Sequence, residues 1–146
     1  MVDPTSDPLP ELRPEGRLGP FELGSRLGRG PSRGLDSEVW SGRRPEPGGR
    51  WVLLEVLIAE TPIARSSFAQ ARRALVAVRD PALGRVFGLH AEGRRVYAAL
   101  ERPDGVALAR LVRVQGPPPV RATLALAADV ARALRRAGQL GVRFRA

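Results

Sequence analysis

Residues 51–59 read WVLLEVLIA, an apolar stretch rich in β-branched and large side chains. Such a run is typical of a buried β-strand. The segment PEPGG at 45–49 precedes it and predicts a turn, because proline fixes φ and glycine permits positive φ. Two more strands are expected before this turn, one in FELGSRLGRG at 21–30 and one around Val39 and Trp40. Together the three segments predict an antiparallel meander.

After this strand the spacing of apolar residues becomes helical. Between Phe68 and Val78 they recur every three or four residues, which predicts a helix over about 64–78. Asp80-Pro81 ends it, since proline disfavours helical geometry in the residue before it. The elements expected next are two strands and then two helices, at 84–90, 94–101, 106–114 and 120–137. The fold class is therefore α+β, with a five-stranded antiparallel sheet, one helix against it and two C-terminal helices.

The composition excludes several classes of function. The chain has no cysteine among its 146 residues, which rules out disulfides, thiolate metal sites and thiol nucleophiles. Its first residues, MVDPTSDPLPELRPEG, carry acids and prolines without an apolar core, so neither a secretory signal nor a membrane anchor is expected. No apolar run approaches the roughly 20 residues that a membrane span needs. We expect a cytoplasmic protein with no membrane partner.

The formal charge of +9 raises the question of nucleic-acid binding. All the basic residues are arginine, and they are spread from Arg13 to Arg145 in singles and pairs, with no run of five or more. Few aromatic residues are present to stack on bases. A biased genomic composition explains the charge more simply, because Arg, Ala, Gly and Pro are abundant while Lys and Asn are absent. No nucleic-acid partner is therefore expected.

Four segments occur in an order that a known family shares. They are GPFELGSRLGRG at 19–30, VLLE at 52–55, FAQARRALVAVRDPAL at 68–83 and ALE at 99–101. Together they resemble the small lobe of bacterial Ser/Thr protein kinases: the glycine-rich loop, the VAIK-type strand, the regulatory helix with its exit loop, and the hinge. The resemblance covers roughly residues 19–146.

The resemblance implies three parts. Residues 1–17, rich in proline and acids, are expected to be a disordered tail. Residues 18–101 correspond to the kinase-like small lobe, and residues 102–146 to the hinge exit and the first two helices of a large lobe whose remainder is missing. A vestigial nucleotide cleft is also implied, lined by Gly28, Gly30, Val39, Leu53 and Glu101.

The resemblance breaks down where the family places its charges. Phosphoryl transfer depends on positioning and charge neutralisation. In the family a strand lysine contacts the phosphates and pairs with a helix glutamate; here these positions hold Glu55 and Ala71, which implies that both partners are lost together. The alternative for Glu55 is a surface carboxylate that pairs with an arginine.

The loops that hold the phosphates and the base differ as well. From Gly30 to Val39 the chain is four residues longer than a GxGxxGxV pattern permits, Pro31 removes an N–H from the loop, and Ser37 falls at the third glycine. At the end of the chain, GVRFRA at 141–146 takes the place of a G-V-x-H-R-D sequence. Phe144 and Ala146 stand there for the expected His and Asp, with only Arg145 matching.

These departures predict a catalytically inactive, pseudokinase-like module that acts through protein–protein interaction or regulation of signalling, without ATP, another cofactor or a metal. Its C-terminal helices are expected to bind a protein partner or a second copy of the chain. Two alternatives stay open. One is an atypical or split Ser/Thr kinase subunit that binds ATP, with Arg50 or Arg72 replacing the lost lysine; the other is a truncated product with little independent function. The single histidine, His90, is expected to be a solvated turn residue.

Overall fold

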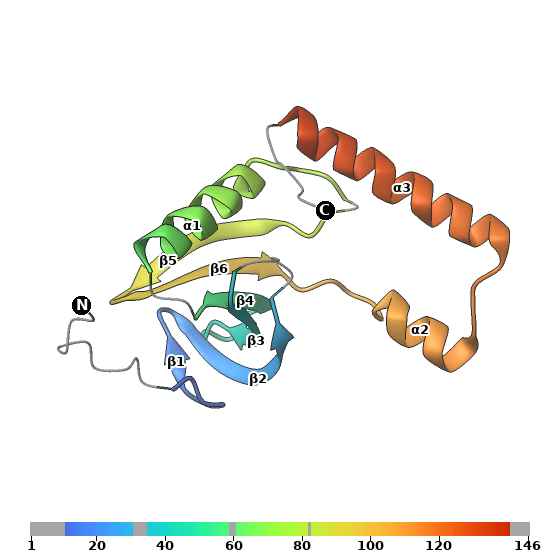
Figure 1. The fold of residues 1–146 in the computed structure, drawn as a ribbon. Helices are drawn as coiled ribbons and strands as arrows, with labels where there is room; N and C mark the ends of the chain where they lie inside the picture. The colour runs from blue at the N-terminus through green and yellow to red at the C-terminus, as the bar shows by residue number, and fades with distance from the viewer. Residues whose placement is uncertain (1–10, 31–34, 59–60, 82, 141–146) are drawn as a thin grey trace.

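The computed structural model describes residues 11–30, 35–58, 61–81 and 83–140 (Figure 1). Within these ranges the chain forms an antiparallel six-stranded sheet of order β1-β2-β3-β4-β6-β5 and three α-helices. The strands are β1 Arg17–Leu18, β2 Phe21–Arg29, β3 Ser37–Arg43, β4 Trp51–Leu57, β5 Val86–Glu92 and β6 Arg95–Glu101. The helices are α1 Pro62–Val76, α2 Leu108–Gln115 and α3 Val120–Gln139.

The meander predicted around 51–59 is confirmed as β2, β3 and β4. The expected number of five strands is wrong, because β1 adds a sixth at the edge of the sheet, where Leu18 pairs with Phe21. This strand is two residues long, too short to leave a periodic signal. It begins inside the segment assigned to the tail, and Leu12 packs against the core there. Residues 1–10 of the expected tail lie outside the described residues.

The sheet buries both of its faces, since side chains alternate along each strand. On one face, β4 contributes Val52, Leu54 and Val56 to a cluster with residues of β1, β2, β3 and β6. On the other face, Leu57 and Ala98 pack against Phe68 of α1. Helix α1 therefore covers one face of the sheet, while the curl of the sheet itself encloses the other (Figure 1).

The curl brings the two ends of the sheet together. The Gly19 amide, in the turn between β1 and β2, donates a 2.8 Å hydrogen bond to Oε2 of Glu92 at the end of β5. Beside it the Phe21 ring meets His90 edge-on at 6.3 Å, and His90 stacks on Tyr97 at 5.2 Å between ring centroids. The prediction that His90 is a solvated turn residue is therefore wrong: it lies within β5, half-buried among aromatic rings.

Helix α1 has clear start signals. The Thr61 hydroxyl accepts a hydrogen bond from the Ala64 amide, and Pro62 occupies the first turn, where its missing N–H costs nothing.

After the helix, buried Val78 packs against Ala137 of α3, and Asp80 forms a 3.0 Å ion pair with Arg136. These contacts hold one end of α3 beside the exit of α1.

The rest of α2 and α3 extends away from the sheet (Figure 1). Helix α2 has no buried residue, and α3 buries only Ala133 and Ala137. Several of their large apolar side chains are exposed, among them Leu108, Val114, Leu124 and Val130. None of the described helices has the length and apolar character needed to cross a membrane.

Candidate functional site

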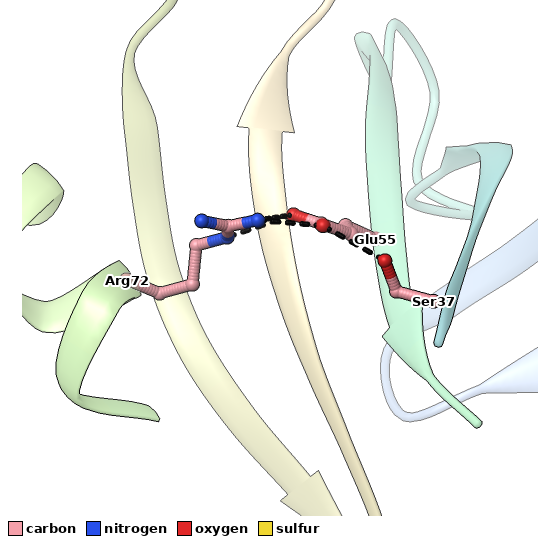
Figure 2. A network of polar contacts seen from close by, with 3 residues as sticks. All are labelled: Ser37, Glu55 and Arg72. Atoms are coloured by element: carbon pink, nitrogen blue, oxygen red, sulfur yellow. Dashed lines mark hydrogen bonds and ion pairs between the residues drawn. The ribbon is translucent and has the colours of Figure 1, made fainter. Parts of the chain in front are cut away.

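Glu55 lies at the centre of a buried polar network that joins β3, β4 and α1 (Figure 2). The Arg72 guanidinium donates from Nε to Oε2 of Glu55 at 2.7 Å and from Nη2 to Oε1 at 2.6 Å. The Ser37 hydroxyl donates to the same Oε1 at 3.0 Å. Two of the elements are neighbours in the sheet and the third is the helix packed on it, so one carboxylate ties three segments together.

Both charges of the pair are removed from water. The side chain of Glu55 is 1% exposed and that of Arg72 is 8% exposed. The Arg72 guanidinium also lies over the Phe68 ring, 5.1 Å from its centroid, one helical turn earlier. Because a bidentate guanidinium matches the two carboxylate oxygens and the ring covers it, the charges compensate each other inside the core. The described side chains leave no buried nitrogen or oxygen without a hydrogen-bond partner.

The partner of Glu55 is Arg72, which is not the helix position that the resemblance to kinases matches to the family's glutamate. Ala71, the position matched to the family's helix glutamate, is exposed, whereas Arg72 is buried. Phe68 and Arg72 are four residues apart and share the face of α1 that meets the sheet. The lysine and the glutamate of the family are both absent, but an ion pair still joins strand and helix, with the acid on the strand and the base on the helix. Glu55 does pair with an arginine, but it is not on the surface.

The residues expected to line a nucleotide cleft lie on neighbouring strands. Gly28 of β2 pairs with Val39 of β3, which in turn pairs with Glu55 of β4. Leu53 and Glu101 lie toward the other end of the sheet, where Leu53 pairs with Leu100, and Glu101 accepts a 3.1 Å hydrogen bond from the Arg85 amide. The register brings Gly28 and Val39 beside the ion pair and places the hinge-like Glu101 further along the sheet. Pro31 and the inserted residues 31–34 lie outside the described residues.

Gly30, the fifth of these positions, touches the network directly. A Cβ at Gly30 would lie 1.9 Å from Oγ of Ser37 and 2.7 Å from Oε1 of Glu55. The backbone of Gly30 is held in place by a 2.8 Å hydrogen bond from its amide to the Ser37 carbonyl. Glycine is therefore needed here to admit the carboxylate and the hydroxyl, which is a role in packing and is independent of any phosphate.

Other candidate chemistry is sparse in the described part of the chain. No group of three or more His, Asp or Glu side chains there could hold a metal ion. The residues matched to the catalytic loop, Phe144, Arg145 and Ala146, lie outside the described residues. The Glu55 network is therefore the main candidate for chemistry in the described residues. Its carboxylate and guanidinium bind each other through two hydrogen bonds.

Comparison with known proteins identifies the architecture. No protein-family model matches the chain, and no curated protein does. A crystal structure of the PknI kinase domain from Mycobacterium tuberculosis superposes with a TM-score of 0.68 at 23% sequence identity, covering 90% of this chain and 53% of that one. Another crystal structure of the same kinase domain gives a TM-score of 0.71 at 22% identity, covering 90% and 52%. The chain thus spans about half the length of the structures that it matches, and its fold is that of a kinase small lobe with the helices that follow.

Proposed function

We propose that this chain is a kinase-like module that does not transfer phosphoryl groups and that acts by binding another protein. The observation that carries the proposal is the buried ion pair of Glu55 and Arg72, which has its charges reversed relative to the lysine–glutamate pair of protein kinases. In kinases the strand lysine of this pair also contacts the α- and β-phosphates of ATP. A carboxylate on the strand retains the link to the helix and removes the phosphate contact.

The sign of the strand charge opposes ATP binding in the kinase pose. At about 4 Å and an effective dielectric near 20, one charge pair is worth on the order of 4 kcal/mol, so a carboxylate replaces an attraction of that size with a repulsion. Pairing with Arg72 reduces this repulsion but supplies no positive charge to the phosphates, because the guanidinium already binds Glu55 through two hydrogen bonds.

Neither arginine considered as a replacement for the lysine is well placed. Releasing Arg72 toward a phosphate would leave Glu55 buried and unpaired, a change that costs about 3–5 kcal/mol. Arg50 precedes β4, five residues before Glu55, and a strand advances about 3.3 Å per residue, so the two Cα atoms lie roughly 17 Å apart. The chain thus keeps an ion pair that links the strand to the helix but lacks the cation that contacts the phosphates. This combination favours a role in recognition.

The exposed faces of α2 and α3 are the surface that we propose for the partner. Both helices extend away from the sheet (Figure 1), and several of their large apolar side chains are exposed. Contiguous exposed apolar surface marks interaction sites. Leu126 is 41% exposed and Val130 is 46% exposed, four residues apart on one face of α3. A second copy of the chain is the occupant that we expect first, because two such helices can bury their faces against each other.

Two measurements test this proposal. In a thermal-shift titration, we expect millimolar Mg-ATP to leave the melting temperature unchanged. A saturable rise in the melting temperature would show that the chain binds ATP and would contradict the proposal. In sedimentation velocity, we expect association that grows with concentration and is weakened by Leu126→Ser/Val130→Ser. The matched control is Arg135→Ser on the same helix. A wild-type chain that stays monomeric, or a double variant that associates like the control, would count against the helical surface.

A further inference from the structure

One mouth of the curled sheet holds a cavity of about 450 Å³, on the opposite face of the sheet from the Glu55 network. It lies between the β3–β4 turn, the start of β2 and strand β5. Its walls include Val52 and Ala99, which belong to the core cluster on the face away from α1. Ligand pockets in proteins are commonly about 300–1,000 Å³ and mostly apolar with a few polar groups, so the size and lining suit a bound side chain.

Aromatic rings form much of the lining. Phe21 and His90 are fixed by each other and by Tyr97, the two ring pairs of His90 being edge-on with Phe21 and stacked with Tyr97. Phe87 is 49% exposed at the edge of the cavity, and the Arg85 guanidinium lies over it at 5.6 Å. An entering ring would meet two rings packed against other aromatic side chains and one exposed ring, an arrangement suited to edge-on or offset packing.

The charges at the opening are mainly positive. Arg44 and Arg50 line the cavity together with a single carboxylate, Glu46. Within the described residues neither arginine forms an ion pair with a carboxylate, and the Arg44 guanidinium lies 5.9 Å from the centroid of the Phe21 ring. A cation without an acidic partner beside an apolar cavity is placed to bind the negative charge of a ligand whose apolar part enters the cavity.

We infer that this cavity binds an aromatic side chain from an acidic segment of a partner protein, with the ring among Phe21, Phe87 and His90 and the neighbouring carboxylates on Arg44 and Arg50. The inference rests on the proposed function, because it names the chemistry of the partner that a non-catalytic module would recognise. The net charge of +9 adds long-range attraction for an acidic chain. The occupant is peptidic because the arginines lie at the rim, where side chains flanking an inserted ring would reach them.

Fluorescence anisotropy with labelled peptides tests the inference on the full chain. The probe is a short Glu- and Asp-rich peptide with one central Trp, compared with the same peptide carrying Ala there, at about 150 mM salt, where surface charges are largely screened beyond about 8 Å. We expect the Trp peptide to bind about tenfold more tightly or better, since buried aromatic anchors dominate such interfaces. Equal binding of the two peptides would show that only charge attraction operates and would overturn the inference.

Three variants locate the binding. Arg44→Glu/Arg50→Glu and Phe87→Ala change exposed residues, and each should weaken the Trp peptide about tenfold with an unchanged circular dichroism spectrum. The matched control, Arg73→Glu, alters an exposed arginine of α1 on the other face of the sheet and should change the affinity less than about twofold. Loss of binding in the control, or tight binding of free indole-3-acetate without any peptide, would contradict a peptide site in this cavity. If the Trp peptide does not bind and Mg-ATP has no effect on the melting temperature, only the inference about this cavity is refuted. If Mg-ATP stabilises the protein, the proposed function itself is refuted.

Discussion

Arg72 of helix α1 and Glu55 of strand β4 form a bidentate ion pair in the core, with Oε2 of Glu55 only 2.5 Å from Nη2 of Arg72. Protein kinases also join a strand to a helix by an ion pair, with the lysine on the strand and the glutamate on the helix, whereas here the acid lies on the strand and the base on the helix. In a kinase this link depends on a lysine that also serves the nucleotide. Here the link is complete without any ligand, so the position of α1 should not depend on nucleotide.

Removing one charge of the pair should be far more harmful than removing both. We expect Arg72→Met to lower the free energy of unfolding by about 3–5 kcal/mol, because Glu55 remains buried without its cation. The double variant Glu55→Met/Arg72→Met should recover most of that loss, since apolar residues of similar volume often replace a buried pair at little cost. Urea unfolding followed by circular dichroism measures both. Equal losses in the single and double variants would mean that the charges contribute little to one another.

Gly30 gives a second test of the same network. Gly30→Ala should lower the free energy of unfolding by about 1–3 kcal/mol, the usual penalty of overpacking, because its Cβ would overlap Ser37 and Glu55. Combining it with Ser37→Gly removes the closest clash and should recover part of the loss. Gly138→Ala is the control: a Cβ there meets nothing within 4 Å, and alanine in a helix should stabilise by about 0.5–1 kcal/mol. A Gly30→Ala variant as stable as the wild type would show that the loop gives way.

The order of the elements could be predicted from the sequence because it depends on local patterns. The apolar run at 51–59 and the three- and four-residue spacing from Phe68 determine a strand and a helix largely by themselves. β1 was missed because a two-residue strand has no period of its own and exists only through pairing with β2. The kinase-like arrangement followed from the resemblance and is confirmed by the structural comparison at the level of the fold.

The candidate site was only partly predictable. The sequence pointed to Glu55 as the residue that departs from the family, and it offered Arg72 only as a substitute for the lysine. The pairing depends on how α1 rotates over the sheet, which buries Arg72 and exposes Ala71, one residue apart. The spacing of four from Phe68 was the available signal, because an arginine on the apolar face of a helix needs a buried acid. The cavity beside Phe21 arises from the curl of the sheet, which joins β2 to β5 across the whole lobe and leaves no local signal.

The contact of α3 with the exit of α1 should control the attachment of the C-terminal helices. Ala137 is fully buried against Val78, so Ala137→Leu should overpack this contact and release α3 at a cost of about 1–3 kcal/mol. Hydrogen exchange measures this residue by residue: amides of α3 should lose protection, while those of β4 and β6 keep it. Ala125→Leu, on the exposed part of α3, is the control and should leave the protection pattern unchanged. Equal loss throughout the sheet would show instead that the lobe and α3 unfold as one unit.

Tyr97 should make the protein less stable in alkaline solution. Burial, and secondarily the negative charge of Glu92, raise the pKa of the Tyr97 hydroxyl above its ordinary value of about 10. As the pH rises through about 10, the unfolded chain releases this proton first, so the free energy of unfolding falls until the folded protein also ionises.

Because Tyr97 is the one tyrosine of the chain, its ionisation can be followed by absorbance near 295 nm without overlap from another phenol. Tyr97→Phe should remove the loss of stability that begins near pH 10, and Glu92→Gln should reduce it only in part, because burial is the larger cause. A phenol that titrates at its ordinary value in the folded protein would instead place the ring in contact with water.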